Sequence, residues 1–203
     1  MPNRIQHALA QIFSYVLHPG IMPTYGTIYV LYSHPNTYHW PLVLHTLISI
    51  FLGTYLAPLL AIFVLKQTGI IESIHLIRRE DRIYPYIAST ACMLATANYL
   101  AGRHLPIEIS LSVYASAFVI LISAILLPFW KSSAHLAGLS GFLALYIGMN
   151  AHYSTGNTTT LVTIVALIGL MAWSRLSLNR HTPRELLSGF FIGFTTLYVL
   201  LSR

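Results

Sequence analysis

The twelve residues SRLSLNRHTPRE (174–185) stand between two apolar runs and decide how the chain around them folds. They hold four of its sixteen charged side chains (11 Lys and Arg plus 5 Asp and Glu), although only 8% of the chain is charged. A polar island between two apolar runs is typical of a turn between two membrane helices. We therefore expect one span to end and another to begin within this stretch.

The composition is that of an integral membrane protein. The 203 residues are 56% hydrophobic, and their charged fraction is far below the roughly one quarter of a soluble domain. The formal net charge is +6, but the positive residues are scattered among apolar segments. This pattern argues against nucleic acid as a partner and favours membrane lipids or an anionic substrate. The length fits a single transmembrane domain, 1–203.

We expect an all-α, polytopic membrane bundle of six or seven transmembrane helices. Within the N-terminal element, 1–39, the apolar run 8–33 is interrupted at His18-Pro19-Gly20 and again at Pro23, so it is either a kinked span or a re-entrant element. Six further spans are expected at 40–65, 84–101, 108–129, 135–151, 159–173 and 185–201. Close helix packing is favoured by glycines along two of them, Gly138, Gly141 and Gly148 in one and Gly189 and Gly193 in the other.

Three polar patches, 78–82, 131–135 and 174–185, are each separated from the next by two spans. Because two spans return the chain to the side of the membrane from which it left, all three patches should emerge on one face. The sequence therefore predicts a site assembled from the three patches.

The third patch offers two interpretations. Thr182, Pro183 and Glu185 have the spacing of a capping box with proline at the first helical position, which accounts for Glu185 without catalysis. That interpretation leaves His181 unexplained. If the first helical turn extends back through His181, the four-residue spacing places Glu185 beside one imidazole nitrogen. A carboxylate there fixes the tautomer and raises the basicity of the other nitrogen.

The other two patches are ambiguous by themselves. His135 opens a span with Ser132 or Ser133 as the expected N-cap, where backbone N–H groups favour an anion, while Lys131 could simply be an interfacial lysine. Arg78 and Arg82 would share one face of a helix and suit phosphate, but basic residues before a span also mark the cytoplasmic side.

Together these residues resemble the type 2 phosphatidic acid phosphatase superfamily, whose membrane members dephosphorylate lipid phosphates and pyrophosphates. The family's third signature is Ser-Arg, five residues, His, three residues, Asp, and the chain has Ser174-Arg175, His181 and Glu185 at that spacing. The second signature, Pro-Ser-Gly-His, is matched by Ser132-Ser133-Ala134-His135, which keeps the Ser and His. The first, Lys, six residues, Arg-Pro, is represented by Arg82 with Pro85, and Arg78 could replace the lysine. The resemblance covers about residues 75–195, the phosphatase-like core.

The resemblance implies hydrolysis without a metal or other cofactor. His181 would attack phosphorus to give a phosphohistidine, Glu185 would orient it, and His135 would protonate the leaving oxygen. The phosphate oxygens would be held by residues from all three patches, namely Arg175, Arg82, Arg78, Lys131, Ser133 and Ser174. A lipid phosphate or pyrophosphate is the implied substrate, with undecaprenyl pyrophosphate in a bacterial inner membrane the first candidate.

Several alternatives stay open. The same fold could act as a lipid phosphotransferase, or as a lipid A or phosphatidylglycerophosphate phosphatase, and the altered first signature admits an inactive relative. Ten histidines, with His45 inside a span, also admit a haem-binding or transport protein. The count of Lys and Arg places the three patches in the cytoplasm, whereas relatives that recycle lipid pyrophosphates commonly face the periplasm.

Overall fold

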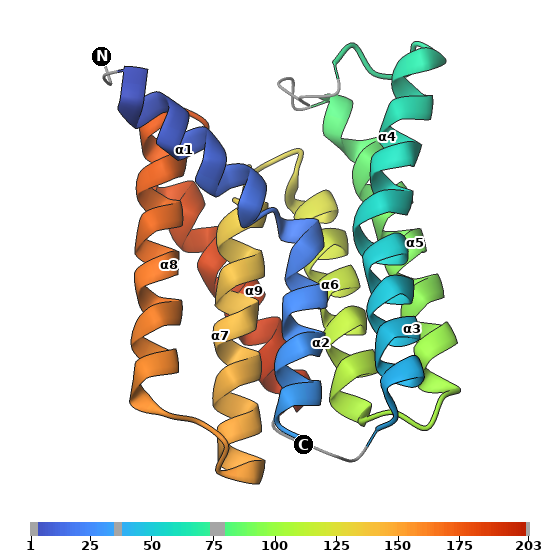
Figure 1. The fold of residues 1–203 in the computed structure, drawn as a ribbon. Helices are drawn as coiled ribbons and strands as arrows, with labels where there is room; N and C mark the ends of the chain where they lie inside the picture. The colour runs from blue at the N-terminus through green and yellow to red at the C-terminus, as the bar shows by residue number, and fades with distance from the viewer. Residues whose placement is uncertain (1–3, 35–37, 74–79, 202–203) are drawn as a thin grey trace. The chain divides into compact units, whose positions relative to one another are not determined.

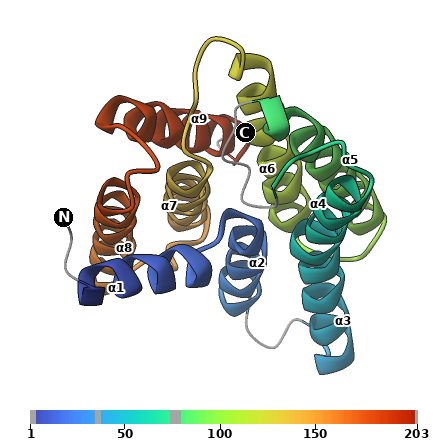
Figure 2. The ribbon, with the colours of Figure 1, turned by 90° about the horizontal axis from the view of Figure 1, so that it is seen from above.

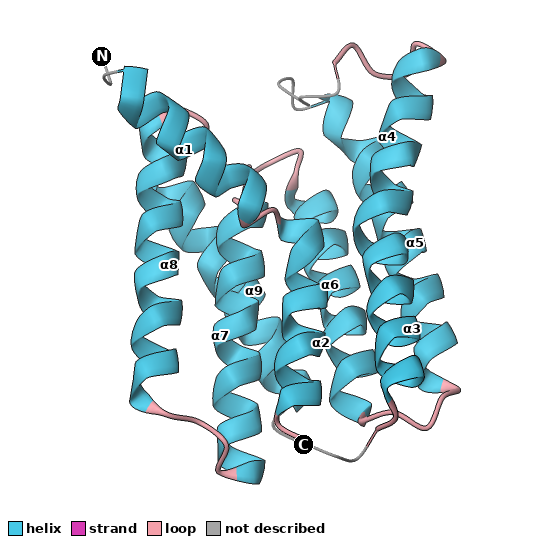
Figure 3. Cartoon of the chain, viewed as in Figure 1, coloured by secondary structure: helices cyan, strands magenta, loops and turns pink. Residues whose placement is uncertain are grey.

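The computed structural model describes residues 4–34, 38–73 and 80–201, which form helices and connecting turns without a strand (Figure 3). The expected all-α fold is therefore confirmed. The chain divides into two compact units, one made of Met1–Met22 with Ser132–Arg203 and the other of Pro23–Lys131. Each is described separately below, and a single transmembrane domain stays a prediction.

Within the described residues, five helical segments are long and apolar enough to cross a membrane: Trp40–Gln67, Ile107–Leu126, Ala134–Tyr153, Thr158–Ser177 and Pro183–Leu201. They coincide with five of the expected spans and identify a membrane protein. Helix α5 (Ile83–Ala101) forms where another span is expected, but it is not among these five. The total of six or seven spans stays a prediction.

The unit Pro23–Lys131 contains α2 (Met22–Tyr32) from its second residue onward, followed by α3 (Trp40–Phe51), η2 (Leu52–Leu56), α4 (Ala57–Gln67), η3 (Glu80–Arg82), α5 and α6 (Ile107–Leu126). Segments α3, η2 and α4 form one long helix in which η2 is a turn of π-helix. There Ala57 N–H donates to Leu52 O, one residue before Pro58. The wider turn accommodates a proline that cannot donate to the helix.

The N-terminal break is only partly as expected. Helix α1 (Arg4–Val16) ends before the 3-10 turn η1 (Pro19–Ile21), so His18-Pro19-Gly20 does interrupt the apolar run. The expected second break at Pro23 is wrong, because Pro23 lies in the first turn of α2, where a missing N–H costs nothing. At 13 and 11 residues, α1 and α2 are each shorter than the about 20 residues that a span needs.

The unit Met1–Met22 with Ser132–Arg203 holds α1, η1, α7 (Ala134–Tyr153), α8 (Thr158–Ser177) and α9 (Pro183–Leu201). Helix α8 runs antiparallel to α7, and α9 then returns in the direction of α7 (Figures 1 and 2). The ends of α7 and α9 are joined at both extremes: Ser133 N–H donates to Glu185 O at 3.1 Å, and His152 Nε2 lies 3.2 Å from Leu201 O.

Glycines allow α7 and α9 to approach closely. A Cβ added at Gly189 would lie 2.3 Å from Ser133 O, and one at Gly193 would lie 2.0 Å from Ala137 O. Both neighbours are backbone atoms, so neither can move aside alone. The expectation that these glycines serve close packing is confirmed, and the start of α9 is thereby placed against the start of α7.

An apolar cluster ties the N-terminal segment to the same end of this unit. It contains Leu17, Met22, Leu136, Leu139, Met171 and Leu186, from α7, α8, α9 and the chain around η1. Burial of each such side chain contributes about 1.5–3 kcal/mol. The segment before α7 is therefore part of the packed unit.

Candidate active site

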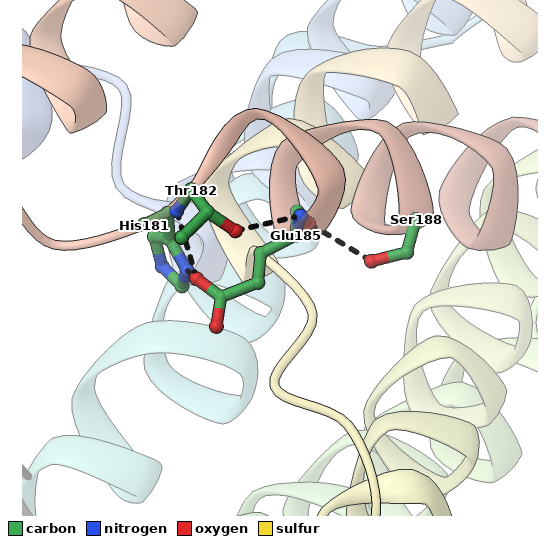
Figure 4. A network of polar contacts seen from close by, with 4 residues as sticks. All are labelled: His181, Thr182, Glu185 and Ser188. Atoms are coloured by element: carbon green, nitrogen blue, oxygen red, sulfur yellow. Dashed lines mark hydrogen bonds and ion pairs between the residues drawn. The ribbon is translucent and has the colours of Figure 1, made fainter.

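The polar island forms the end of α8, a turn and the start of α9. Thr182 N–H donates to Glu185 Oε2 at 2.9 Å, and Glu185 N–H donates to Thr182 Oγ1 at 3.4 Å (Figure 4). Proline occupies the first helical position, Pro183. The expected capping box is thus confirmed, and it fixes the direction in which α9 leaves the turn.

His181 is held by the same carboxylate. Its Nδ1 lies 3.2 Å from Glu185 Oε2, the atom that also accepts from Thr182 N–H (Figure 4). The helix does not extend back through His181, so the capping turn itself creates this pair. An ionised carboxylate only accepts, so Nδ1 carries the hydrogen and Nε2 keeps its lone pair. The side chains are 5% and 20% exposed, which shields their interaction from water.

Ser133 stands at the start of α7, beside this pair. As expected by position it is the N-cap, but its side chain makes no capping bond. Its backbone N–H donates to Glu185 O instead, and its buried hydroxyl has no hydrogen-bond partner among the described residues. Leaving a buried hydroxyl unsatisfied costs about 1–3 kcal/mol, which favours a role for it in binding a ligand.

His135 and Arg175 lie in the same unit and contact α1. His135 Nε2 lies 3.2 Å from Ser14 O, and Arg175 Nη1 donates to Ser14 Oγ at 3.1 Å. Arg175 and His135 thus contact the same residue, and Ser133, two residues before His135, is bonded to Glu185. The structure therefore brings together His135, Arg175, His181, Glu185 and Ser133, the residues of the second and third patches that carry the expected chemistry.

Ser174 is placed differently from the expectation that it holds phosphate. Its buried hydroxyl donates to Ala10 O at 2.6 Å and shares a 2.9 Å hydrogen bond with Ser14 Oγ. Both hydrogen bonds of this hydroxyl are to residues of α1, so Ser174 links the end of α8 to the N-terminal helix.

Sequence reasoning missed the N-terminal contribution from Ser14 and His18. The His18 ring packs edge-on against His135, with ring centroids 5.7 Å apart, and its Nδ1 accepts from Gly20 N–H at 3.2 Å. Burial, and secondarily the Arg175 guanidinium, lowers the pKa of His18 to about 4, so this ring is neutral at neutral pH. Pro19 and Gly20 signalled the turn, but no local pattern signalled the contact across 117 residues (135 − 18).

The first patch belongs to the other unit. Arg82 precedes α5 as its N-cap, and Lys131 is the last residue of that unit. Arg78 lies outside the described residues. The convergence of all three patches, with Arg82, Arg78 and Lys131 on the phosphate, therefore stays a prediction, whereas Ser133 and His135 of the second patch do meet the third.

His45, the intramembrane histidine that raised the haem alternative, makes a contact between helices. Its Nε2 lies 3.2 Å from Tyr99 OH, and Arg103 Nη2 donates to the same hydroxyl at 2.6 Å. The described residues contain no group of three or more His, Cys, Asp or Glu that could hold a metal ion.

Fold and composition define the class as an all-helical membrane protein. Comparisons with protein-family models, with curated proteins and with solved structures found no match for this chain. The argument for a function therefore rests on the site itself.

Proposed function

We propose that this protein is an integral membrane phosphatase that hydrolyses a lipid phosphate or pyrophosphate through a phosphohistidine. The observation that carries the proposal is the shielded His181–Glu185 pair at the start of α9, 3.2 Å between Nδ1 and Oε2, beside the buried hydroxyl of Ser133. A histidine oriented by a carboxylate is the arrangement that activates an imidazole for nucleophilic attack or proton transfer.

In this mechanism His181 Nε2 attacks phosphorus as the bond from phosphorus to the leaving oxygen breaks. Glu185 accepts from Nδ1–H and stabilises the positive charge that develops on the ring. Protonated His135 gives its proton to the leaving oxygen, and neutral His135 then takes a proton from the water that attacks the phosphohistidine. The second step breaks the nitrogen–phosphorus bond and returns both rings to their starting states.

Charge stabilisation is the remaining requirement of phosphoryl transfer, because the transition state spreads negative charge over the phosphoryl oxygens. Arg175 supplies a guanidinium, which matches two of these oxygens at once. The Ser133 hydroxyl supplies a donor already stripped of water. Arg82, Arg78 and Lys131 would add further positive charge.

The substrate that suits a bundle of membrane helices is a small phosphorylated head group on a long apolar chain. Undecaprenyl pyrophosphate in a bacterial inner membrane is the first candidate. The test is phosphate release by the purified protein from a panel of lipid phosphates and pyrophosphates in EDTA. Release from at least one is expected; release from none contradicts the proposal, and label moved to an added lipid acceptor would identify a phosphotransferase instead.

Replacing Glu185 with glutamine is expected to lower kcat about 100-fold or more while the protein stays folded. The amide oxygen can still accept from Thr182 N–H and close the capping box, but it cannot stabilise a positive His181 ring as a carboxylate does. The measurement is kcat for phosphate release together with the melting temperature in detergent. Thr182→Ala is the matched control, because it loses one capping bond and leaves the His181–Glu185 pair, so its melting temperature should fall and its kcat should change little. An unchanged rate, or an unfolded Glu185→Gln protein, would show that the carboxylate does not serve both purposes.

A further inference from the structure

The C-terminal end of α1 contacts Arg175 and His135, two side chains on which the proposed reaction depends. This segment lies outside the region of resemblance, yet it belongs to the same compact unit as His135 and Arg175. Ser14 makes both contacts, one with its side chain and one with its backbone. The inference that follows rests on the proposed function.

The side-chain contact is part of a chain of hydrogen bonds whose directions are fixed. Ser174 Oγ donates to Ala10 O at 2.6 Å, so its only hydrogen is used there. Ser14 must then donate across the 2.9 Å contact to Ser174 Oγ, which leaves Ser14 Oγ to accept from Arg175 Nη1 at 3.1 Å. Each hydroxyl both donates and accepts, an arrangement in which neighbouring bonds strengthen one another.

The backbone contact orients His135. Ser14 O is among the last four carbonyls of α1, which have no partner within the helix. A carbonyl only accepts, so the 3.2 Å contact requires the hydrogen on His135 Nε2 and leaves Nδ1 as the nitrogen that can take and give a proton. The end of a helix also carries partial negative charge, which favours the guanidinium of Arg175 nearby.

The packing around η1 holds this end of α1 in place. A Cβ added at Gly138 would lie 2.9 Å from Met22 Cγ and 3.4 Å from Pro19 Cα, so η1 rests directly on α7. Leu17 and Met22 lie in the apolar cluster with residues of α7, α8 and α9. Ser14 is thus held by packing on the chain that follows it as well as by its own hydrogen bonds.

We propose that Ser14 is a positioning residue of the phosphatase site, whose hydroxyl aims Arg175 at the phosphoryl oxygens while its carbonyl fixes the tautomer of His135. The two roles separate in a Ser14→Ala variant. That change removes the hydroxyl and its hydrogen bond from Arg175 Nη1, whereas the carbonyl and its contact with His135 remain.

The test compares Ser14→Ala with the parent in phosphate release and in inhibition by vanadate, which takes the trigonal bipyramidal geometry of the transition state. We expect kcat/KM to fall about 10- to 100-fold, as for loss of a hydrogen bond to a charged group. The inhibition constant for vanadate should rise in the same proportion. The limb of the pH profile that reports His135 should not shift. Ser14→Thr, which keeps the hydroxyl, should restore most of the loss.

Ser140→Ala is the matched control, because it also removes a fully buried serine hydroxyl in this unit, one that donates to Ala137 O within α7. It should match the parent in all these measurements. If Ser14→Ala only damaged folding, a smaller fraction of the protein would be active, so the apparent kcat would fall while the inhibition constant for vanadate stayed unchanged. That result would overturn the role of Ser14. An unaltered Ser14→Ala protein overturns it as well, while the phosphatase proposal survives if activity depends on His181. A parent protein without activity overturns both.

Discussion

Replacing His181 with alanine is expected to abolish phosphate release, with a loss of roughly 10⁶-fold in kcat, as for removal of the nucleophile from a serine hydrolase. The reason is the position of the ring: Glu185 holds Nδ1 at 3.2 Å, so Nε2 is the atom left to bond phosphorus. The variant should keep its melting temperature to within a few degrees, because the capping bonds between Thr182 and Glu185 do not involve the imidazole.

The same experiment can observe the intermediate directly. With substrate carrying labelled phosphorus, rapid denaturation in alkali should trap label on the parent protein in a bond that acid breaks, as expected of a phosphoramidate. Peptide mapping should place it at His181. His104→Ala is the matched control, since this histidine is exposed in the turn after α5, and it should trap label like the parent. Full activity in His181→Ala, or label on another residue, would overturn the assignment of the nucleophile.

Replacing Gly193 with alanine is expected to have the largest effect on stability. The new methyl group would stand 2.0 Å from Ala137 O, a backbone atom, so α9 must move away from α7. Overpacking of this kind costs about 1–3 kcal/mol or more. Because the two helices also meet where Ser133 N–H donates to Glu185 O, the displacement should lower activity together with the melting temperature.

Gly169→Ala supplies the control for that change. Gly169 lies within α8, and a Cβ added there meets nothing within 4 Å. Since alanine favours a helix over glycine by up to about 1 kcal/mol, this variant should be as stable as the parent or more stable. Equal melting temperatures for Gly193→Ala and Gly169→Ala would contradict the close approach of α7 and α9.

Local patterns in the sequence predicted what local forces determine. The lengths of the apolar runs predicted the positions of the long helices. The spacing of Thr182 and Glu185 predicted a capping box, and both of its reciprocal hydrogen bonds form. The pairing of His181 with Glu185 was also predicted, although through a helical turn that is absent. The N-cap turn folds the chain back and brings the two side chains together.

Contacts between distant segments could not be predicted in this way. Ser14 meets Ser174 across 160 residues, and no periodicity in either segment signals the other. The same holds for Ser133, one of the two serines, with Ser132, that were expected to cap α7. The Ser133 N–H donates to Glu185 O, and Gly189 of α9 lies close to the Ser133 backbone. Both contacts depend on how α9 packs against α7, which the residues around Ser133 do not indicate.

One oxygen atom, Glu185 Oε2, accepts both from the amide that starts α9 and from the proposed nucleophile. Selection for a stable protein would therefore retain a glutamate or a glutamine at this position in descendants that had lost activity. Neither capping bond of α9 involves the His181 ring, so the capping box can close without this histidine. Among homologous chains, loss of the histidine beside a retained glutamate or glutamine is thus expected to mark the lineages in which hydrolysis has ended.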